Sequence, residues 1–378
     1  MVIRGLVFSA LVMLLMVTMA SVGVASGATI YVPDNYTTIQ AAVDAAFDSD
    51  TVIVRDGIYN ENVNVNKRLT IRSENGSANC IVQVENPNSP VFKVTADYVN
   101  IRGFTVSGAH YEGIRLDHSS HCNIFNNNLS NNGMGSYVGR GICLVYSLNN
   151  VISHNDIANN DYGLHIRLAS SNNNISNNNI SNNDWYGIYL EHSSHNNKIS
   201  YNYISNNGWG VTLYYSIGNN INNNNFINDG LFVDESYQNF VENNIVNNKP
   251  LVYLENVSDY TIGDAGQVIL VNCNNITMDD LNMSNTDLGI EFFNTSSSKI
   301  MNCNCSDNNG GIILRRSSNN NISDNNISNN DYGIDLDGSS NNNKISNNNI
   351  PNNKRTVSYT HLRAHETRHD LVCRLLLE

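Results

Sequence analysis

The sequence predicts an all-β fold, a right-handed single-stranded parallel β-helix with about 22–24 residues per coil. Three observations lead to this prediction. A phrase of glycine followed by apolar-x-apolar recurs nine times between Gly113 and Gly333, at a mean spacing of about 22 residues. Most copies are followed by two apolar residues five positions apart, such as Ile175 and Ile180. Asparagine supplies 72 of the 378 residues and recurs at fixed places in the repeat.

These apolar phrases account for the strands of each coil. Apolar residues at alternate positions are typical of short strands with one buried face. Three such strands per repeat, separated by asparagine and glycine turns, make one coil of a solenoid. Coils stacked about 4.8 Å apart give each backbone N–H and C=O a partner in a neighbouring coil. A helical bundle is excluded, because asparagine is a poor helix former.

Asparagine at a fixed place in every coil is expected to hydrogen-bond its counterpart one coil away. Such a ladder explains how a residue disfavoured in ordinary strands can fill a β-protein. Asparagine also suits the turns, because it tolerates left-handed backbone. We predict the structural ladder three positions after the first apolar residue of each pair, at Asn127, Asn155, Asn178, Asn202, Asn224, Asn243, Asn325 and Asn348.

Composition divides the chain into four segments. Residues 1–28 are predicted to be a signal peptide, because Arg4 precedes a long apolar stretch and residues 25–28 are small. An uncleaved membrane anchor is the alternative. Residues 29–108 are expected to form an N-terminal cap and irregular first coils, and residues 109–353 the regular coils. Within the cap, residues 37–47 predict a short helix that buries one apolar stripe, made of Ile39, Ala42, Val43, Ala46 and Phe47.

The repeat stops after Asn353. Residues 354–378 contain no asparagine or glycine, and we interpret them as a non-native tail produced by a translation artefact. Within the tail, His365 and His369 formally match the H-E-x-x-H metalloprotease pattern. Such a site would also need a defined third metal ligand, a substrate cleft and a supporting shell, for which the sequence gives no sign, so we assign no site there.

The N-terminal segment resembles a known superfamily. The stretches Ile39–Val43, Asp50–Val54 and Gly57–Glu61 are similar to the opening of right-handed β-helix proteins of the pectin-lyase-like superfamily. The later coils resemble the repeats of NosD-like periplasmic proteins and of archaeal surface proteins. The resemblance covers roughly residues 29–353 and implies the fold. It selects no activity, because this superfamily includes lyases, hydrolases, esterases and non-enzymatic surface proteins.

Charge and cysteine content exclude several classes of protein. The formal net charge is −13, with 21 basic against 34 acidic residues, which argues against nucleic acid as a partner. Glycine-rich phosphate-binding patterns are absent. The seven cysteines show no regular spacing, and we expect them to be small buried residues rather than a disulfide framework.

The outward positions of the glycine-containing strands are candidates for ligand contact. Aromatic residues stacked coil upon coil beside charged side chains favour a carbohydrate-binding strip. The alternative is that the same aromatic rings only cover the turn and stabilise stacking. The candidate carbohydrate-binding residues are Tyr162, His165, Arg167, Tyr186, Glu191, Trp209 and Tyr332.

No catalytic residue and no metal ligand is assigned from the sequence. A lyase of this superfamily would need an aspartate cluster that holds Ca²⁺, and a hydrolase would need facing carboxylates. Asp335 and Asp337 form the densest acidic stretch, but ordinary surface carboxylates explain it equally well. Copper would need closely spaced histidines, and the pairs His118/His121 and His192/His195 lie three coils apart. We therefore expect no cofactor, since neither Ca²⁺ nor copper has a clear site.

We interpret the chain as an exported cell-surface or secreted protein with a structural or binding role, in contact with carbohydrate. The partner would be an extracellular or cell-wall polysaccharide, and the membrane would be reached only through an uncleaved signal. The chain would act as a monomer or as part of a larger surface protein, and it would be periplasmic in a Gram-negative cell. A polysaccharide lyase or glycoside hydrolase is the first alternative, and a NosD-like periplasmic metal-accessory protein is the second.

Overall fold

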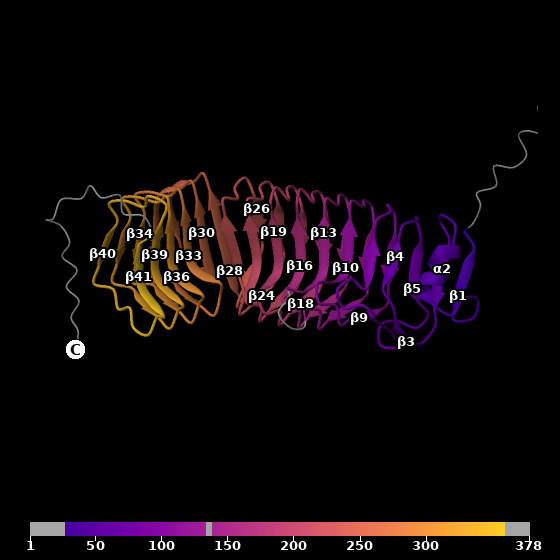
Figure 1. Cartoon of the computed structure of the whole chain (residues 1–378). Coiled ribbons are helices and arrows are strands. Elements are labelled where there is room, and N and C mark those ends of the chain that lie inside the picture. Colours follow the sequence, from indigo (N-terminus) through magenta and orange to yellow (C-terminus); the bar gives the residue numbers. More distant parts are fainter. Residues whose placement is uncertain (1–26, 134–137, 360–378) are drawn as a thin grey trace, which may run out of the picture.

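The computed structural model describes residues 27–133 and 138–359 and shows an elongated parallel β-helix of about 15 turns (Figure 1). The fold class predicted from the repeat is confirmed. No helix within the described ranges is long and apolar enough to cross a membrane. The expected signal peptide, apart from its last two residues, and most of the C-terminal tail lie outside the described residues.

The first solenoid has three parallel sheets, to which successive strands belong in rotation. Sheet A contains β1 (Thr29–Val32), β2 (Thr51–Val54), β5 (Thr70–Ser73), β8 (Asn100–Arg102), β11 (Asn123–Phe125), β14 (Val151–Ser153), β17 (Asn174–Ser176), β20 (Lys198–Ser200), β23 (Asn220–Asn222) and β26 (Phe240–Glu242). Sheet B contains β3 (Gly57–Asn60), β6 (Cys80–Gln83), β9 (Thr105–Ser107), β12 (Asn128–Ser130), β15 (Asp156–Ala158), β18 (Asn179–Ser181), β21 (Tyr203–Ser205), β24 (Asn225–Ile227) and β27 (Ile245–Val246). Sheet C contains β4 (Val63–Val65), β7 (Phe92–Val94), β10 (Glu112–Asp117), β13 (Arg140–Val145), β16 (Tyr162–Arg167), β19 (Tyr186–Glu191), β22 (Trp209–Tyr214) and β25 (Leu231–Asp234).

A short helix, α2 (Ile39–Ala45), covers the N-terminal end of the solenoid (Figure 1). The Thr38 hydroxyl accepts a hydrogen bond from Ala41 N–H, as expected of an N-cap residue. The Glu61 carboxylate accepts two further N–H groups of the first turn, each at 2.9 Å. The predicted stripe is wrong at Phe47, which is 80% exposed because the helix ends at Ala45 and the chain turns away.

Buried asparagines form the predicted ladder between the coils. In each step, one Asn Oδ1 accepts both the backbone N–H and the Nδ2–H of its counterpart in the preceding coil. Asn155 donates in this way to Asn178 at 3.0 and 3.1 Å, and Asn178 donates to Asn202 at 3.0 Å twice. The prediction is wrong at Asn243, which is exposed. Asn244 occupies the place below Asn224, because Val241 and Val246 point inward there in place of Phe240 and Ile245.

Two further asparagine ladders support the corners of the first solenoid. Their members bond from coil to coil, at Asn132, Asn160, Asn183 and Asn207, and at Asn150, Asn173, Asn197, Asn219 and Asn239. The geometry is the same except at the last step, where Asn219 donates only its backbone N–H to Asn239. One of them explains the recurring glycine. A Cβ on Gly163 would lie 2.6 Å from the carbonyl oxygen of Gly187 and 2.9 Å from Asn183 Nδ2, so any larger residue would push adjacent coils apart.

Within the described residues, the strand direction reverses once, after the first solenoid. Strands β27 and β28 (Lys249–Glu255) pair antiparallel through a hairpin at Asn247 and Asn248, which have φ values of 48° and 67°. Two consecutive positive φ values are typical of a type I′ turn. The strands that follow β28 in its own sheet are parallel to it, so they run opposite to those of sheet B although both groups belong to one 15-stranded sheet.

A second solenoid follows the hairpin. Sheet D contains β28 (Lys249–Glu255), β30 (Gln267–Val271), β33 (Leu288–Phe293), β36 (Gly310–Arg315), β39 (Tyr332–Asp337) and β41 (Arg355–Tyr359). Sheet E contains β29 (Ser258–Ile262), β31 (Asn274–Asp279), β34 (Lys299–Met301), β37 (Asn321–Ser323) and β40 (Lys344–Ser346). Sheet F contains β32 (Asn282–Ser284), β35 (Asn304–Ser306) and β38 (Asn326–Ser328). Strand β41 lies beyond the last asparagine of the repeat and still pairs parallel with β39.

The two solenoids have separate cores on opposite faces of sheet D. Ile269, Val271 and Phe293 pack with the core of the first solenoid, whereas their neighbours Leu270 and Phe292 belong to the core of the second. All five residues of β30 and all six of β33 are therefore buried. The strand direction reverses, and at the same time the opposite face of the sheet turns toward the core. Because both change together, the second solenoid coils with the same hand as the first.

Polar side chains of sheet D close the open end of sheet C. The Gln267 amide is fully buried, accepts Leu231 N–H at 2.9 Å and donates to Leu231 C=O at 2.7 Å, as a neighbouring strand would. Glu291 accepts Val233 N–H, and Asp287 accepts Gly210 N–H at 2.9 Å. The end of the first solenoid is thus capped by side chains of the second.

Candidate functional site

The outer face of sheet C brings most of the predicted ligand-binding residues together. Tyr162, His165 and Arg167 lie on β16, and Tyr186 and Glu191 lie on the adjacent strand β19. Trp209 follows on β22, in register with Tyr186. Tyr332 does not join them, because it lies on β39 of the second solenoid, where Arg355 covers its ring at 5.1 Å. We call the outer face of β10, β13, β16, β19 and β22 the sheet C face.

Aromatic rings stack across neighbouring strands of this face. The ring centroids of Tyr162 and Tyr186 are 5.0 Å apart, and those of Tyr186 and Tyr189 are 4.6 Å apart. Trp185 contacts Tyr162 at 5.6 Å and is 49% exposed. The rings therefore form a continuous stack over two coils, and the indole of Trp185 beside it is half exposed.

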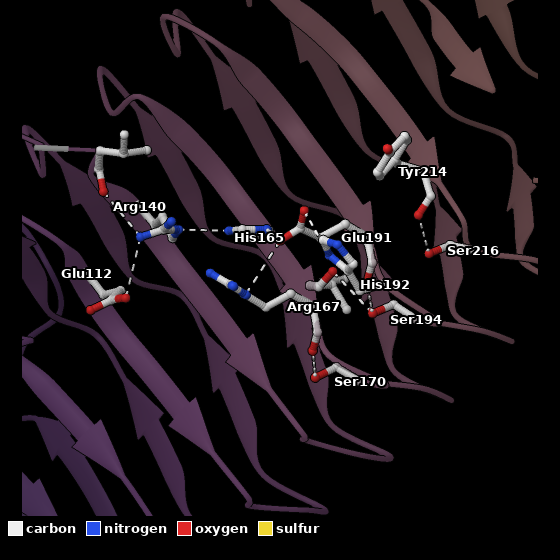
Figure 2. Close-up of polar contacts among 12 residues, drawn as sticks. Glu112, Arg140, His165, Arg167, Ser170, Glu191, His192, Ser194, Tyr214 and Ser216 are labelled. Carbon is white, nitrogen blue, oxygen red and sulfur yellow. Dashed lines mark hydrogen bonds and ion pairs between the residues drawn. The ribbon is translucent and has the colours of Figure 1, made fainter. Parts of the chain in front are cut away.

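Charged side chains form a network beside the rings (Figure 2). Arg140 Nε donates to His165 Nδ1 at 2.7 Å, and His165 Nε2 lies 3.0 Å from Glu191 Oε1. The network extends to Glu112 at one end, 3.5 Å from Arg140 Nη1. At the other end, His192 Nδ1 lies 3.1 Å from Glu191 Oε2. Side chains from β10, β13, β16 and the end of β19 are thus tied together across four coils.

His165 is held as a neutral imidazole. Since Arg140 donates to Nδ1, the ring proton must sit on Nε2, where it is donated to Glu191. Burial, together with the nearby Arg140 and Arg167 charges, lowers the pKa of His165 to about 4 despite the opposing pull of Glu191. Both ring nitrogens are engaged and the residue is 2% exposed. In this arrangement His165 links side chains of neighbouring strands and has no free nitrogen with which to accept or donate a proton in catalysis.

Glu191 remains ionised. Burial alone would raise its pKa, but the hydrogen bond from His165 and the positive charges around it lower the pKa to about 2. Its two oxygens are occupied by His165, Arg167 and His192. The groups left for a ligand are the half-exposed His192 ring, the partly exposed Arg167 guanidinium and the partly exposed rings of Tyr186 and Tyr189, whereas Tyr162 is buried.

Sequence reasoning missed four participants of this face. Trp185 and Tyr189 extend the aromatic surface, and Glu112 and Arg140 extend the charged network. Tyr189 was detectable, because it occupies the same position of the repeat as His165. Glu112 and Arg140 both stand directly before a repeat glycine, but their pairing depends on which coils are neighbours.

Histidine pairs and cysteines of the described residues form no shared site. In the first H-x-x-H pair, the His118 ring contacts Tyr146 at 4.8 Å while His121 stacks on Tyr98 at 4.8 Å. In the second, His192 contacts Glu191, and His195 Nδ1 accepts a backbone N–H at 2.9 Å. Within residues 27–133 and 138–359, no cluster of three or more His, Cys, Asp or Glu residues could hold a metal ion. The six described cysteines are buried and free.

The fold and this face define a parallel β-helix protein with an aromatic and charged outer strip. The sequence profile of the family described as right-handed β-helix region matches residues 91–249 and 228–367. These matches cover more than half of the chain, which therefore belongs to this family.

Individual proteins resemble the chain either over part of its length or at low sequence identity. A cell surface glycoprotein of Methanothermus fervidus is 34% identical over 126 residues, which are 32% of this chain and 21% of that protein. Among solved structures, the Dettilon tailspike protein has a TM-score of 0.50 and 14% identity, covering 88% of this chain and 68% of the other. An alginate lyase from Paenibacillus sp. has a TM-score of 0.49 and 15% identity, covering 85% and 99%. At these identities the structural likeness concerns the fold alone.

Proposed function

We propose that this chain is a cell-surface β-helix protein that binds a polysaccharide along the sheet C face. The observation that carries the proposal is the stack of Tyr162, Tyr186 and Tyr189, with Trp185 exposed beside it. Pyranose rings present apolar faces, and an aromatic surface with adjacent polar groups suits them. Similarity to part of a cell surface glycoprotein supports the surface location.

The charged network favours binding over catalysis. A general acid or base must reach the substrate with a free proton or lone pair. His165 is buried with both nitrogens engaged. Glu191 has a low pKa, is hydrogen-bonded by His165, and has Arg167 and His192 within ion-pair distance. The network therefore supports a rigid platform whose exposed groups contact hydroxyls.

The test is affinity electrophoresis of the whole protein through gels that contain soluble glucan, alginate or pectin. We expect retardation by at least one polymer, and at least a tenfold weaker affinity for the Trp185→Ala, Tyr186→Ala double variant, because the stacking surface is lost. Tyr260→Ala is the matched control, since Tyr260 is 52% exposed and lies on β29 of the second solenoid. Migration unaffected by every polymer, or equal losses in both variants, would overturn the proposal.

The same preparations separate the two alternatives. Release of unsaturated uronates or reducing ends during incubation would identify a lyase or a hydrolase. Copper that survives dialysis, and is lost in the His118→Ala, His192→Ala variant, would identify a metal-accessory protein. Either result would replace the binding role proposed here.

A further inference from the structure

The outer face of sheet A carries arginines without counter-charges, although the chain has 21 basic and 34 acidic residues. One outward row runs from β2 to β11 through Ile53, Arg72, Arg102 and Phe125. The other outward row of these strands consists of threonine and asparagine. We propose that Arg72 and Arg102 together bind one phosphate monoester. The pair shares no residue with the sheet C face, so this site is independent of the function proposed above.

The two arginines are direct neighbours across adjacent strands. Arg72 of β5 is in register with Arg102 of β8, at a strand spacing of about 4.8 Å. Like charges that stand directly opposite each other repel. The flanking members of the row, Ile53 and Phe125, supply no negative charge. An anion held between the two guanidinium groups would therefore replace this repulsion with attraction on both sides.

Other arginines of the first solenoid are paired with carboxylates. Carboxylate oxygens lie 2.6 to 3.5 Å from Arg55, Arg115, Arg140 and Arg167. No acidic side chain in the described part of the chain forms an ion pair with Arg72 or Arg102, whose contacts are with a carbonyl oxygen and an aromatic ring. The positive charge of this pair is therefore available to a ligand.

Both guanidinium groups are anchored and keep most of their donors. Arg72 Nη1 donates to the carbonyl oxygen of Ser73 at 3.1 Å. The Arg102 guanidinium lies over the Phe125 ring, 5.5 Å from its centroid. Each guanidinium has five N–H groups in a fixed plane, so these contacts leave most of the donors free. Both side chains are partly buried, and a planar group that is already held loses less freedom when it binds.

Charge and shape favour a phosphate monoester. At neutral pH this group carries roughly −1.5 to −2 charges, which match two guanidinium groups, and its oxygens accept N–H groups from both. A single carboxylate would neutralise only one of the arginines. A nucleic-acid backbone would need a longer row of cations, whereas the next cation on the strands of this face is Lys198 of β20, four strands beyond Arg102. The pair therefore fits one isolated phosphate, carried by a soluble molecule or by a lipid headgroup.

Binding of inorganic phosphate to the whole protein, followed by phosphorus NMR, tests the proposal. We expect binding that is weaker by at least about tenfold in the Arg72→Gln, Arg102→Gln double variant, because its charge-assisted hydrogen bonds are lost. The double variant should melt no lower than the unmodified protein, since it also removes the repulsion between the arginines. Lys198→Gln is the matched control, because it removes one cation from the same face outside the pair. We expect it to change phosphate affinity less than about twofold.

Vesicles identify the source of the phosphate. Cosedimentation with phosphatidylcholine vesicles that contain phosphatidic acid, lost in the double variant and absent with phosphatidylcholine alone, would assign the site to a lipid headgroup. Binding of inorganic phosphate without cosedimentation would assign it to a soluble phosphate. Failure of both probes, or equal weakening in the double variant and Lys198→Gln, would overturn the proposal. The Trp185→Ala, Tyr186→Ala variant should keep phosphate binding, so failure at this site and failure at the sheet C face are distinguishable.

Discussion

Asn178 shows how one side chain holds neighbouring coils together. Its Oδ1 accepts two hydrogen bonds from Asn155, and its Nδ2 donates to the carbonyl oxygen of Ile152 at 2.9 Å. All these groups are buried, where an unsatisfied donor or acceptor costs roughly 1–3 kcal/mol. The ladder therefore satisfies backbone groups at a corner, where no strand does so.

Replacing Asn178 with leucine should destabilise the fold, by roughly 1–3 kcal/mol for each buried group left without a partner. The backbone N–H of Asn155 loses its partner, and the carbonyl of Ile152 loses the hydrogen bond from Asn178 Nδ2. Thermal unfolding followed by circular dichroism measures the change. Asn179→Leu is the control, because Asn179 is exposed on the next strand. Equal melting temperatures for the two variants would show that the hydrogen bonds of Asn178 do not stabilise the fold as proposed.

At the scale of elements, the hairpin between β27 and β28 changes the architecture. It reverses the strand direction and exchanges the inward face, so β25 is left as the last strand of sheet C. Exposed strand edges invite wrong pairing and are normally covered. Here Gln267 covers this edge by bonding both backbone groups of Leu231.

We expect Gln267→Leu to loosen this edge while leaving the distant coils intact. The variant keeps a similar volume but removes both hydrogen bonds to Leu231, at roughly 1–3 kcal/mol for each buried group left unsatisfied. Amide hydrogen exchange should become faster at Leu231 and unchanged at Ile175, which lies several coils away. Equal amide exchange rates at Leu231 in the variant and in the unmodified protein would contradict the capping role.

At the scale of the whole molecule, three buried carboxyl groups lie where the two solenoids meet. Burial and mutual repulsion raise the pKa of Asp229 and burial raises that of its neighbour Asp287. Burial also raises the pKa of Glu291, to about 8, although Arg315 opposes the shift. The junction is therefore most stable when these groups carry their protons.

The sign of the pH dependence follows from these shifts. An unfolded aspartate titrates near about 3.9, and the folded pKa of Asp287 lies above this value. Its contribution to stability is therefore fully present below the unfolded pKa and is lost as the pH rises through the folded pKa.

Replacing Asp287 with asparagine should remove this loss of stability at high pH. We expect its melting temperature to exceed that of the unmodified protein by an amount that grows from pH 4 to pH 9, on the order of 2–4 °C for each kcal/mol. His165 and Glu191, whose lowered pKa values weaken the fold toward acid pH, are unchanged in the variant and cancel in the difference. A difference that stays constant with pH would show that Asp287 does not titrate in this range.

The sequence by itself determined the coil. Inward residues such as Ile175 and the ladder at Asn178 could be assigned because a solenoid repeats the same local environment, so periodicity reports burial directly. The same logic failed at Asn243, where a shift of one residue exchanges the two faces of a strand.

Only the tertiary structure decided which coils belong to which core and which outward residues meet. Tyr332 resembles Tyr186 in its repeat, yet lies in the second solenoid. His165 points outward, yet is covered by Arg140, Tyr162 and Tyr189 from its own and adjacent strands. The physical reason is that periodicity specifies the environment within a coil, whereas the hairpin at Asn247 and the contacts between unlike side chains occur once and leave no repeating signal.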